Sequence, residues 1–120
     1  MILFDTNVLV EMVRERRYEV GAITIITLIE FLRGIAGSEK RFRAKELLEQ
    51  SFTILNLDNE AVKTYCDLYS KLKRKGELIP DTDLLIAAIA LSHDMTLKTR
   101  DKHFEKLREM GLKVEYVKQS

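Results

Sequence analysis

Hydrophobic residues along the chain fall into short apolar runs that are separated by longer segments with helical spacing. Each short run is bounded by polar residues, which is typical of a buried strand. The runs lie at residues 2–4, 22–26, 52–55, 95–98 and 112–117. This alternation predicts an α/β fold, a three-layer α/β/α sandwich with a mostly parallel central sheet. At this length we expect residues 1–120 to form a single domain.

Two of the intervening segments predict helices of contrasting character. From 84 to 91 every residue is apolar, so a helix there is expected to be buried on nearly all sides and central to the core. Residues 38–50 are mostly polar and charged, and Phe42, Leu47 and Leu48 are expected to face inward from that helix.

The composition limits the classes of function. The chain is 46% hydrophobic and 32% charged, with a net charge of +1, so any binding of nucleic acid must depend on local basic clusters or on a metal. One cysteine excludes an internal disulfide and fits a reducing compartment, so we expect a cytoplasmic protein. No segment reaches the roughly 18 apolar residues that a membrane span needs, and the apolar start lacks the basic region of a signal peptide.

Acidic residues accompany the apolar runs. Asp5 directly follows the first run, Asp101 comes shortly after the fourth, and Asp83 directly precedes the apolar segment 84–91. Ligands of parallel α/β sheets bind just past the carboxyl ends of the strands, so these acids are candidates for a shared site. The alternative is that Asp5 only caps the following helix, and that Asp81 or Asp83 does the same for the apolar one.

Glu30 is embedded among apolar residues. It lies in a short helix over 28–33 that Thr27 is expected to cap. Burying a carboxylate is costly unless it is paired or binds a cation, which makes Glu30 a fourth candidate. The alternative is that Glu30 lies on a polar helix face beside Arg33.

A cluster of these carboxylates predicts a metal site. Two like charges 4 Å apart repel by on the order of 4 kcal/mol at an effective dielectric constant of about 20, so the acids must be protonated or held together by a cation. Oxygen ligands without cysteine or histidine suit Mg²⁺ or Mn²⁺. Such an ion can activate water and stabilise the leaving oxygen of a phosphodiester, which indicates metal-dependent phosphodiester hydrolysis.

Four motifs, taken in order, resemble those of the PIN-domain family, and within it the short VapC toxin ribonucleases of toxin–antitoxin pairs. They are Phe4-Asp5-Thr6-Asn7, then Leu28-Ile29-Glu30-Phe31-Leu32-Arg33-Gly34, then Ile79-Pro80-Asp81-Thr82-Asp83-Leu84-Leu85-Ile86-Ala87-Ala88, then Leu97-Lys98-Thr99-Arg100-Asp101-Lys102-His103-Phe104. The resemblance covers essentially the whole chain. It implies a parallel α/β/α sandwich and a Mg²⁺- or Mn²⁺-dependent endoribonuclease.

The resemblance also assigns roles to residues. The acidic quartet that binds the metal and performs catalysis would be Asp5, Glu30, Asp83 and Asp101. The hydroxyls of Thr6 and Thr99 would support this quartet, with Asn7 and Asp81 beside it.

The expected partners likewise follow from the resemblance. They are an RNA substrate, a second copy in a homodimer, and a small VapB-type antitoxin. An apolar surface around Met12 and Phe31–Leu32 is the candidate for the protein contacts.

The chain departs from the family pattern at two positions. Asp81 adds an acid, so the third ligand could be shared, although Asp83 is favoured because it directly precedes the apolar helix. His103 stands where the family often has an acid. We expect His103 to be a surface residue, and contact with substrate is the alternative.

Two other functions remain open at this point. Asp5 could be the nucleophile of a haloacid-dehalogenase-like phosphatase, but that chemistry expects a second aspartate where Asn7 stands. The chain could also be a PIN-like RNA-binding module without catalysis, although the complete quartet argues against this.

Overall fold

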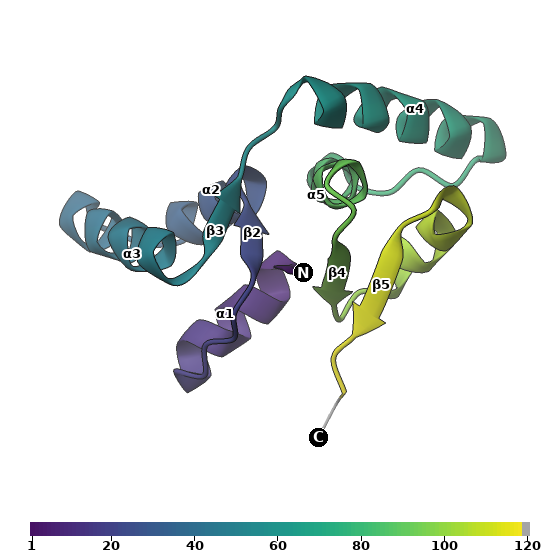
Figure 1. The fold of residues 1–120 in the computed structure, drawn as a ribbon. Coiled ribbons are helices and arrows are strands. Elements are labelled where there is room, and N and C mark those ends of the chain that lie inside the picture. Colours follow the sequence, from purple (N-terminus) through teal and green to yellow (C-terminus); the bar gives the residue numbers. More distant parts are fainter. Residues whose placement is uncertain (119–120) are drawn as a thin grey trace.

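The protein is described here by a computed structural model that covers residues 1–118. Strands and helices alternate along the chain (Figure 1). In chain order they are β1 (Ile2–Phe4), α1 (Thr6–Glu15), β2 (Ala22–Thr24), α2 (Ile25–Arg33), α3 (Ser38–Ser51), β3 (Thr53–Leu55), α4 (Asn59–Lys75), α5 (Asp81–Ser92), β4 (Thr96–Thr99), the 3₁₀ helix η1 (Lys102–Met110) and β5 (Lys113–Tyr116).

All five strands of the sheet are parallel, in the order β3-β2-β1-β4-β5. The chain therefore builds the sheet outward from β1 in one direction and then, after α4 and α5, from β4 in the other. β1 and β4 are direct neighbours, with Leu3 opposite Leu97. The reversal between them is the kind of switch point at which open α/β sheets bind ligands. The predicted fold class is confirmed.

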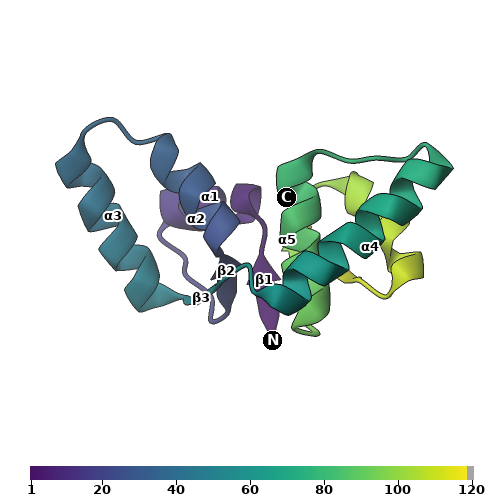
Figure 2. The same ribbon diagram turned by 90° about the horizontal axis from the view of Figure 1, so that it is seen from above.

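Helices pack on the sheet in two groups, with α1, α2 and α3 apart from α4 and α5 (Figure 2). Each group buries a separate apolar cluster against one face of the sheet. Successive side chains of a strand point to opposite faces, so Leu3 packs in one cluster and the next residue, Phe4, in the other. α4, α5 and η1 contribute to the cluster with Leu3, and α1, α2 and α3 to the one with Phe4. Right-handed crossovers produce this arrangement when the direction of winding reverses.

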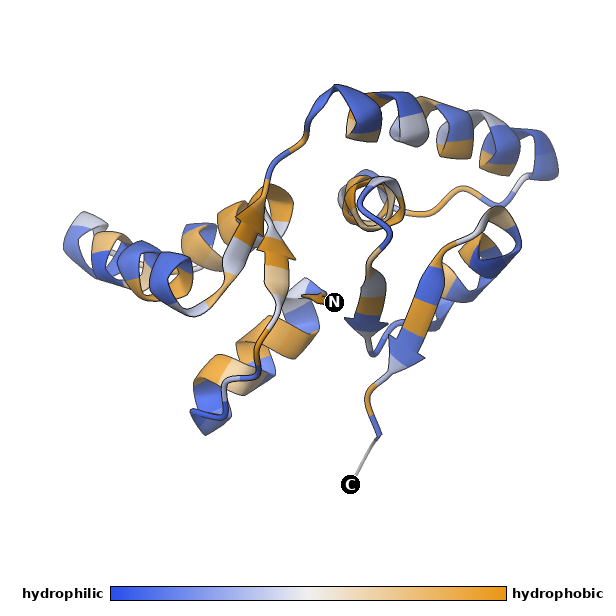
Figure 3. Ribbon diagram, viewed as in Figure 1, coloured by the Kyte–Doolittle hydropathy of each residue, from blue (hydrophilic) through white to orange (hydrophobic). Residues whose placement is uncertain are grey.

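The helix α5 is the most deeply buried helix, as its sequence predicts. Each residue from Ile86 to Ala90 is fully buried. In Figure 3 this helix is orange almost throughout, whereas α4, which lies over it, is blue along its outer side. In the described residues, 1–118, no helix is both long enough and apolar enough to cross a membrane.

The structure corrects three local predictions. β2 ends at Thr24, not at residue 26, and it is Thr24, not Thr27, that caps α2, because its hydroxyl accepts a hydrogen bond from the Thr27 N–H at 3.0 Å. The prediction that Phe42 and Leu47 face inward is also wrong: they are 63% and 44% exposed. Only Leu48 of that predicted trio is buried.

Candidate active site

Three of the predicted acids meet at the carboxyl end of the central strands. Asp5 follows β1 and Asp101 comes two residues after the end of β4, which is paired with β1. Asp83, in the first turn of α5, lies at the same place, because Nε2 of His103 contacts the carboxylates of both Asp83 and Asp101. The switch point between β1 and β4 therefore receives carboxylates from three separate segments.

Asp5 is buried and held by two hydrogen bonds. Its Oδ1 accepts from the Thr6 N–H at 2.8 Å at the start of α1, and its Oδ2 accepts from the Thr99 hydroxyl at 2.7 Å. The Thr99 hydroxyl also accepts from the backbone N–H of Asp101 at 3.0 Å. Asp5 is thus a helix cap and a member of the acidic site at once, and Thr99 connects it to Asp101.

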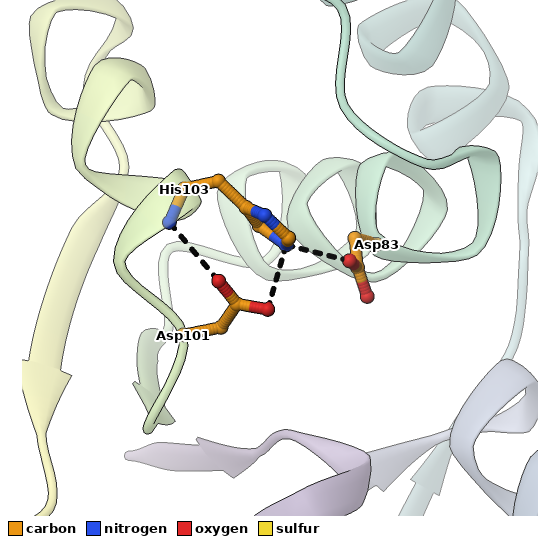
Figure 4. Close-up of side chains that lie close together, drawn as sticks. All are labelled: Asp83, Asp101 and His103. Carbon is orange, nitrogen blue, oxygen red and sulfur yellow. Dashed lines mark hydrogen bonds and ion pairs between the residues drawn. The ribbon is translucent and has the colours of Figure 1, made fainter.

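Asp83, Asp101 and His103 form the centre of the site (Figure 4). The Nε2 atom of His103 lies 2.8 Å from Oδ2 of Asp83 and 2.8 Å from Oδ2 of Asp101. The other oxygen of Asp101 accepts from the His103 N–H at 3.1 Å and so caps η1. The imidazole therefore bridges the two carboxylates, and its predicted position as a plain surface residue is corrected.

Glu30 reaches toward the site from α2. Its Oε1 accepts a 2.7 Å hydrogen bond from the Thr6 hydroxyl, which also lies 3.0 Å from the hydroxyl of the buried Thr27. Arg33 approaches the other oxygen of Glu30 at 3.8 Å. Glu30 therefore contacts Arg33, as the alternative reading expects, and its side chain is also hydrogen-bonded to Thr6, the residue that follows Asp5.

The electrostatics of the site disfavour a full set of ionised acids. Burial raises the pKa of Asp5 above its usual value, and the charges of Asp83 and Asp101 add to this, while hydrogen bonds from Thr99 and Thr6 oppose it. Burial likewise raises the pKa of Asp83, with His103 opposing and with Asp101 and Glu30 adding to the rise. These carboxylates thus share one electrostatic environment that a cation would stabilise.

The donor atoms present fit a divalent cation. One ligand atom each from Asp83, Asp101 and His103 lies within 4.8 Å of the others, which makes these residues a candidate metal site within the described part of the chain. The two carboxylate oxygens are ligands that Mg²⁺ and Mn²⁺ accept, and the imidazole nitrogen is a ligand that transition metals accept.

A family model for the PIN domain matches residues 2–110. The chain belongs to the PIN-domain family. A relative in Methanocaldococcus jannaschii, ribonuclease VapC1, is 41% identical over 94% of this chain and 85% of its own.

Solved structures of toxin–antitoxin proteins share the fold of this PIN domain. The structure of VapBC-1 from nontypeable Haemophilus influenzae matches with a TM-score of 0.82 at 26% identity, over 97% of this chain and 98% of that chain. VapBC-5 from Mycobacterium tuberculosis, a member of the VapBC family of toxin–antitoxin systems, matches with a TM-score of 0.70 at 26% identity, over 98% and 97%.

Two of the predicted supporting residues of this PIN domain, Asp81 and Asn7, have surroundings of their own. Asp81 accepts a 2.8 Å hydrogen bond from the hydroxyl of Tyr65 on α4, and it does not cap α5, whose N-cap is Pro80. Asn7 is exposed and lines a cleft of about 510 Å³ together with Arg100. Neither residue is among the three that form the candidate metal site.

His103 is the residue of this PIN domain that sequence reasoning undervalued. A signal was present, because His103 stands two residues after Asp101, in the first turn of the helix that Asp101 caps. What the sequence did not show is the approach of Asp83, which belongs to another helix, 20 positions away along the chain.

Proposed function

We propose that this PIN domain is a metal-dependent endoribonuclease that hydrolyses RNA phosphodiester bonds as the toxin of a toxin–antitoxin pair. The observation that carries the proposal is the convergence of Asp5, Asp83 and Asp101, with Glu30 joined through Thr6, at the switch point of a PIN fold. The relative with 41% identity is a ribonuclease. The intact acidic site argues against a binding module without catalysis.

The proposed metal ligands are Asp5, Glu30, Asp83 and Asp101. A bound Mg²⁺ or Mn²⁺ would supply the positive charge that activates water and stabilises the leaving oxygen of the phosphodiester. Thr99 and the backbone N–H of Thr6 hold the Asp5 carboxylate in place, and the Thr6 hydroxyl does the same for Glu30. These hydrogen bonds hold the carboxylates in position before substrate binds. The loss of conformational freedom on ordering them therefore adds nothing to the reaction barrier.

The phosphatase alternative has less support. Asp5 is only 4% exposed, and each of its oxygens accepts a hydrogen bond, so it is poorly placed to attack phosphorus. Asn7, where a phosphatase of that class would have its second aspartate, is exposed.

The test is cleavage of a structured RNA that contains single-stranded loops. We expect cutting with Mg²⁺ or Mn²⁺ that leaves no cyclic phosphate, because metal-activated water rather than the ribose 2′-OH is the nucleophile. The Asp101→Asn variant should be slower by at least about 100-fold, and Asp67→Asn, on the exposed part of α4, should be unchanged. Full activity in excess EDTA, or a 2′,3′-cyclic phosphate end, would contradict the proposal.

We further propose that a small antitoxin docks on the exposed apolar residues of α2 and α3. These two helices pack together, and Ile29 and Phe42 on them are 54% and 63% exposed. The surface predicted around Met12 is not available, because Met12 is only 5% exposed and packs in the core. Phe31 and Leu32 are half-buried and pack against the same cluster.

We also propose that the protein self-associates and is located in the cytoplasm. A homodimer is expected by relation to the family, and light scattering at high micromolar concentration tests it, since a strictly monomeric protein would contradict it. An RNA substrate and the free, exposed thiol of Cys66 both fit a reducing cytoplasm.

A further inference from the structure

We propose that His103 is a nitrogen ligand of the metal and that it makes this site prefer Mn²⁺ to Mg²⁺. The inference rests on the metal-dependent function proposed above and assigns to the site a ligand outside the acidic quartet.

Nε2 of His103 is directed at the point where two carboxylates meet. It lies 2.8 Å from an oxygen of Asp83 and 2.8 Å from an oxygen of Asp101 (Figure 4). The three ligand atoms are all within 4.8 Å of one another, so they form a triangle whose centre a single cation can reach. In the structure Nε2 of the imidazole lies between these two carboxylates.

The ring is held in this orientation from two sides. The backbone N–H of His103 donates to the side chain of Asp101 at 3.1 Å, which fixes the start of η1. The ring lies edge-on to the fully buried Phe104, with centroids 5.5 Å apart and planes at 65°. A ligand that is already oriented loses little conformational freedom when it binds an ion.

The kind of donor atom determines the preference. Carboxylate and water oxygens suit Mg²⁺ and Mn²⁺ alike, whereas imidazole nitrogen favours transition metals. Mg²⁺ is bound mainly by oxygen and gives up its water reluctantly. Exchange of one oxygen donor for Nε2 should therefore strengthen Mn²⁺ binding more than Mg²⁺ binding.

A different role for the ring predicts the opposite result. If the imidazole only neutralises Asp83 and Asp101 in the metal-free state and moves away when a metal binds, then it competes with the ion. Removing it would then strengthen the binding of Mn²⁺ and Mg²⁺ together.

The experiment measures metal binding directly. Mn²⁺ affinity is taken from the loss of the free-ion electron paramagnetic resonance signal, and Mg²⁺ affinity from competition, for the unmodified protein, His103→Asn and His93→Asn. His93 is the matched control, because its Nε2 also contacts a carboxylate, Asp58 at 3.2 Å, but at the C-terminal end of α5. We expect His103→Asn to weaken Mn²⁺ at least about tenfold, to change Mg²⁺ much less, and His93→Asn to change neither.

A spectroscopic measurement on the unmodified protein tests the inference even if the variant misfolds. Bound Mn²⁺ should show ¹⁴N modulation in electron spin echo measurements, and this modulation should persist in His93→Asn and vanish in His103→Asn. Bound Mn²⁺ without nitrogen modulation, or equal strengthening of both metals in His103→Asn, would overturn the inference and leave metal-dependent RNA cleavage standing. Failure of the unmodified protein to bind either metal would overturn the proposed function as well.

Discussion

Thr99 donates its hydroxyl proton to Oδ2 of Asp5 at 2.7 Å, across 94 positions of the chain. The same hydroxyl oxygen accepts the N–H of Asp101 at 3.0 Å. One buried side chain at the end of β4 therefore aligns the acid of β1 with the acid that follows β4. This explains why two acids from distant parts of the sequence face the same point.

Replacing Thr99 with Val should destabilise the protein strongly for such a small change in side-chain structure. The change keeps the volume but removes a hydrogen bond to a buried carboxylate and leaves the Asp101 N–H unpaired, which costs about 1–3 kcal/mol. Urea denaturation of the metal-free protein measures this loss. Thr96→Val, at the start of the same strand, is the control and should cost much less. Equal losses in the two variants would show that the hydroxyl of Thr99 has no special part in the site.

Replacing Asp83 with Asn should stabilise the metal-free protein. The ionised carboxylate of Asp83 is disfavoured by burial and by the charges of Asp101 and Glu30, so the neutral amide should raise the free energy of unfolding by about 1 kcal/mol. The stabilisation that Mn²⁺ gives the unmodified protein should shrink or disappear, because a ligand stabilises only the form that binds it.

The matched variant for this test is Asp81→Asn. Asp81 accepts its hydrogen bond from Tyr65 and not from a residue of the site, so the Mn²⁺ shift in melting temperature should persist. An Asp83→Asn protein that is less stable without metal and keeps its full Mn²⁺ shift would show that Asp83 is not a ligand.

The stability of the metal-free protein should depend on pH in the way that the raised pKa of Asp83 dictates. The pKa of Asp83 is raised above its usual 3.8, so the folded state binds this proton more tightly than the unfolded state does. The stability that results is fully present below pH 3.8 and is lost as the pH rises through the folded pKa. In metal-stripped protein, Asp83→Asn should therefore exceed the unmodified protein in melting temperature most at neutral pH, and the gap should close on acidification. A gap that stays constant or widens toward low pH would have the wrong sign.

Gly21, which precedes β2, should not tolerate a side chain. A Cβ at this position would lie 2.5 Å from Cε2 of Phe4 and 2.6 Å from the carbonyl oxygen of Ile2, so Gly21→Ala must displace β1. Overpacking of this kind costs about 1–3 kcal/mol, and RNA cleavage should fall with it because Asp5 follows Phe4. Gly34→Ala is the control, since its nearest contact is the Phe31 carbonyl at 3.5 Å. Unchanged stability of Gly21→Ala in urea would show that β1 can shift at little cost in free energy.

The proposed antitoxin surface can be tested by introducing a negative charge into it. Phe42→Asp places a carboxylate in the exposed apolar surface of α2 and α3 and should weaken binding of a VapB-type antitoxin at least about tenfold. Val62→Asp, on α4 and 45% exposed, is the control and should bind normally. Both variants should keep RNA cleavage. Normal binding by Phe42→Asp, measured by calorimetry, would place the antitoxin elsewhere.

The sequence by itself determined the architecture and named the candidate acids. Apolar runs and helical spacing are local properties, and they record whether a segment is buried, which is why β1, β4 and the buried helix α5 were all predicted. Ordered motifs around Asp5, Glu30, Asp83 and Asp101 identified the family. Local patterns were least reliable where polar side chains compete, as at Thr24, which ends β2 two residues early by capping α2.

Only the tertiary structure decided which side chains meet. The bridge from Asp83 through His103 to Asp101, and the bond from Thr6 to Glu30, join residues on different elements. Their distances depend on strand order and on how α2 and α5 lie against the sheet. The exposure of Phe42 is of the same kind, because a side chain on a helix is buried only where another element covers that face. The periodicity of buried positions is a property of a single segment, whereas contacts between segments depend on how the whole chain packs. The position of the histidine in the site could therefore be seen only in the folded molecule.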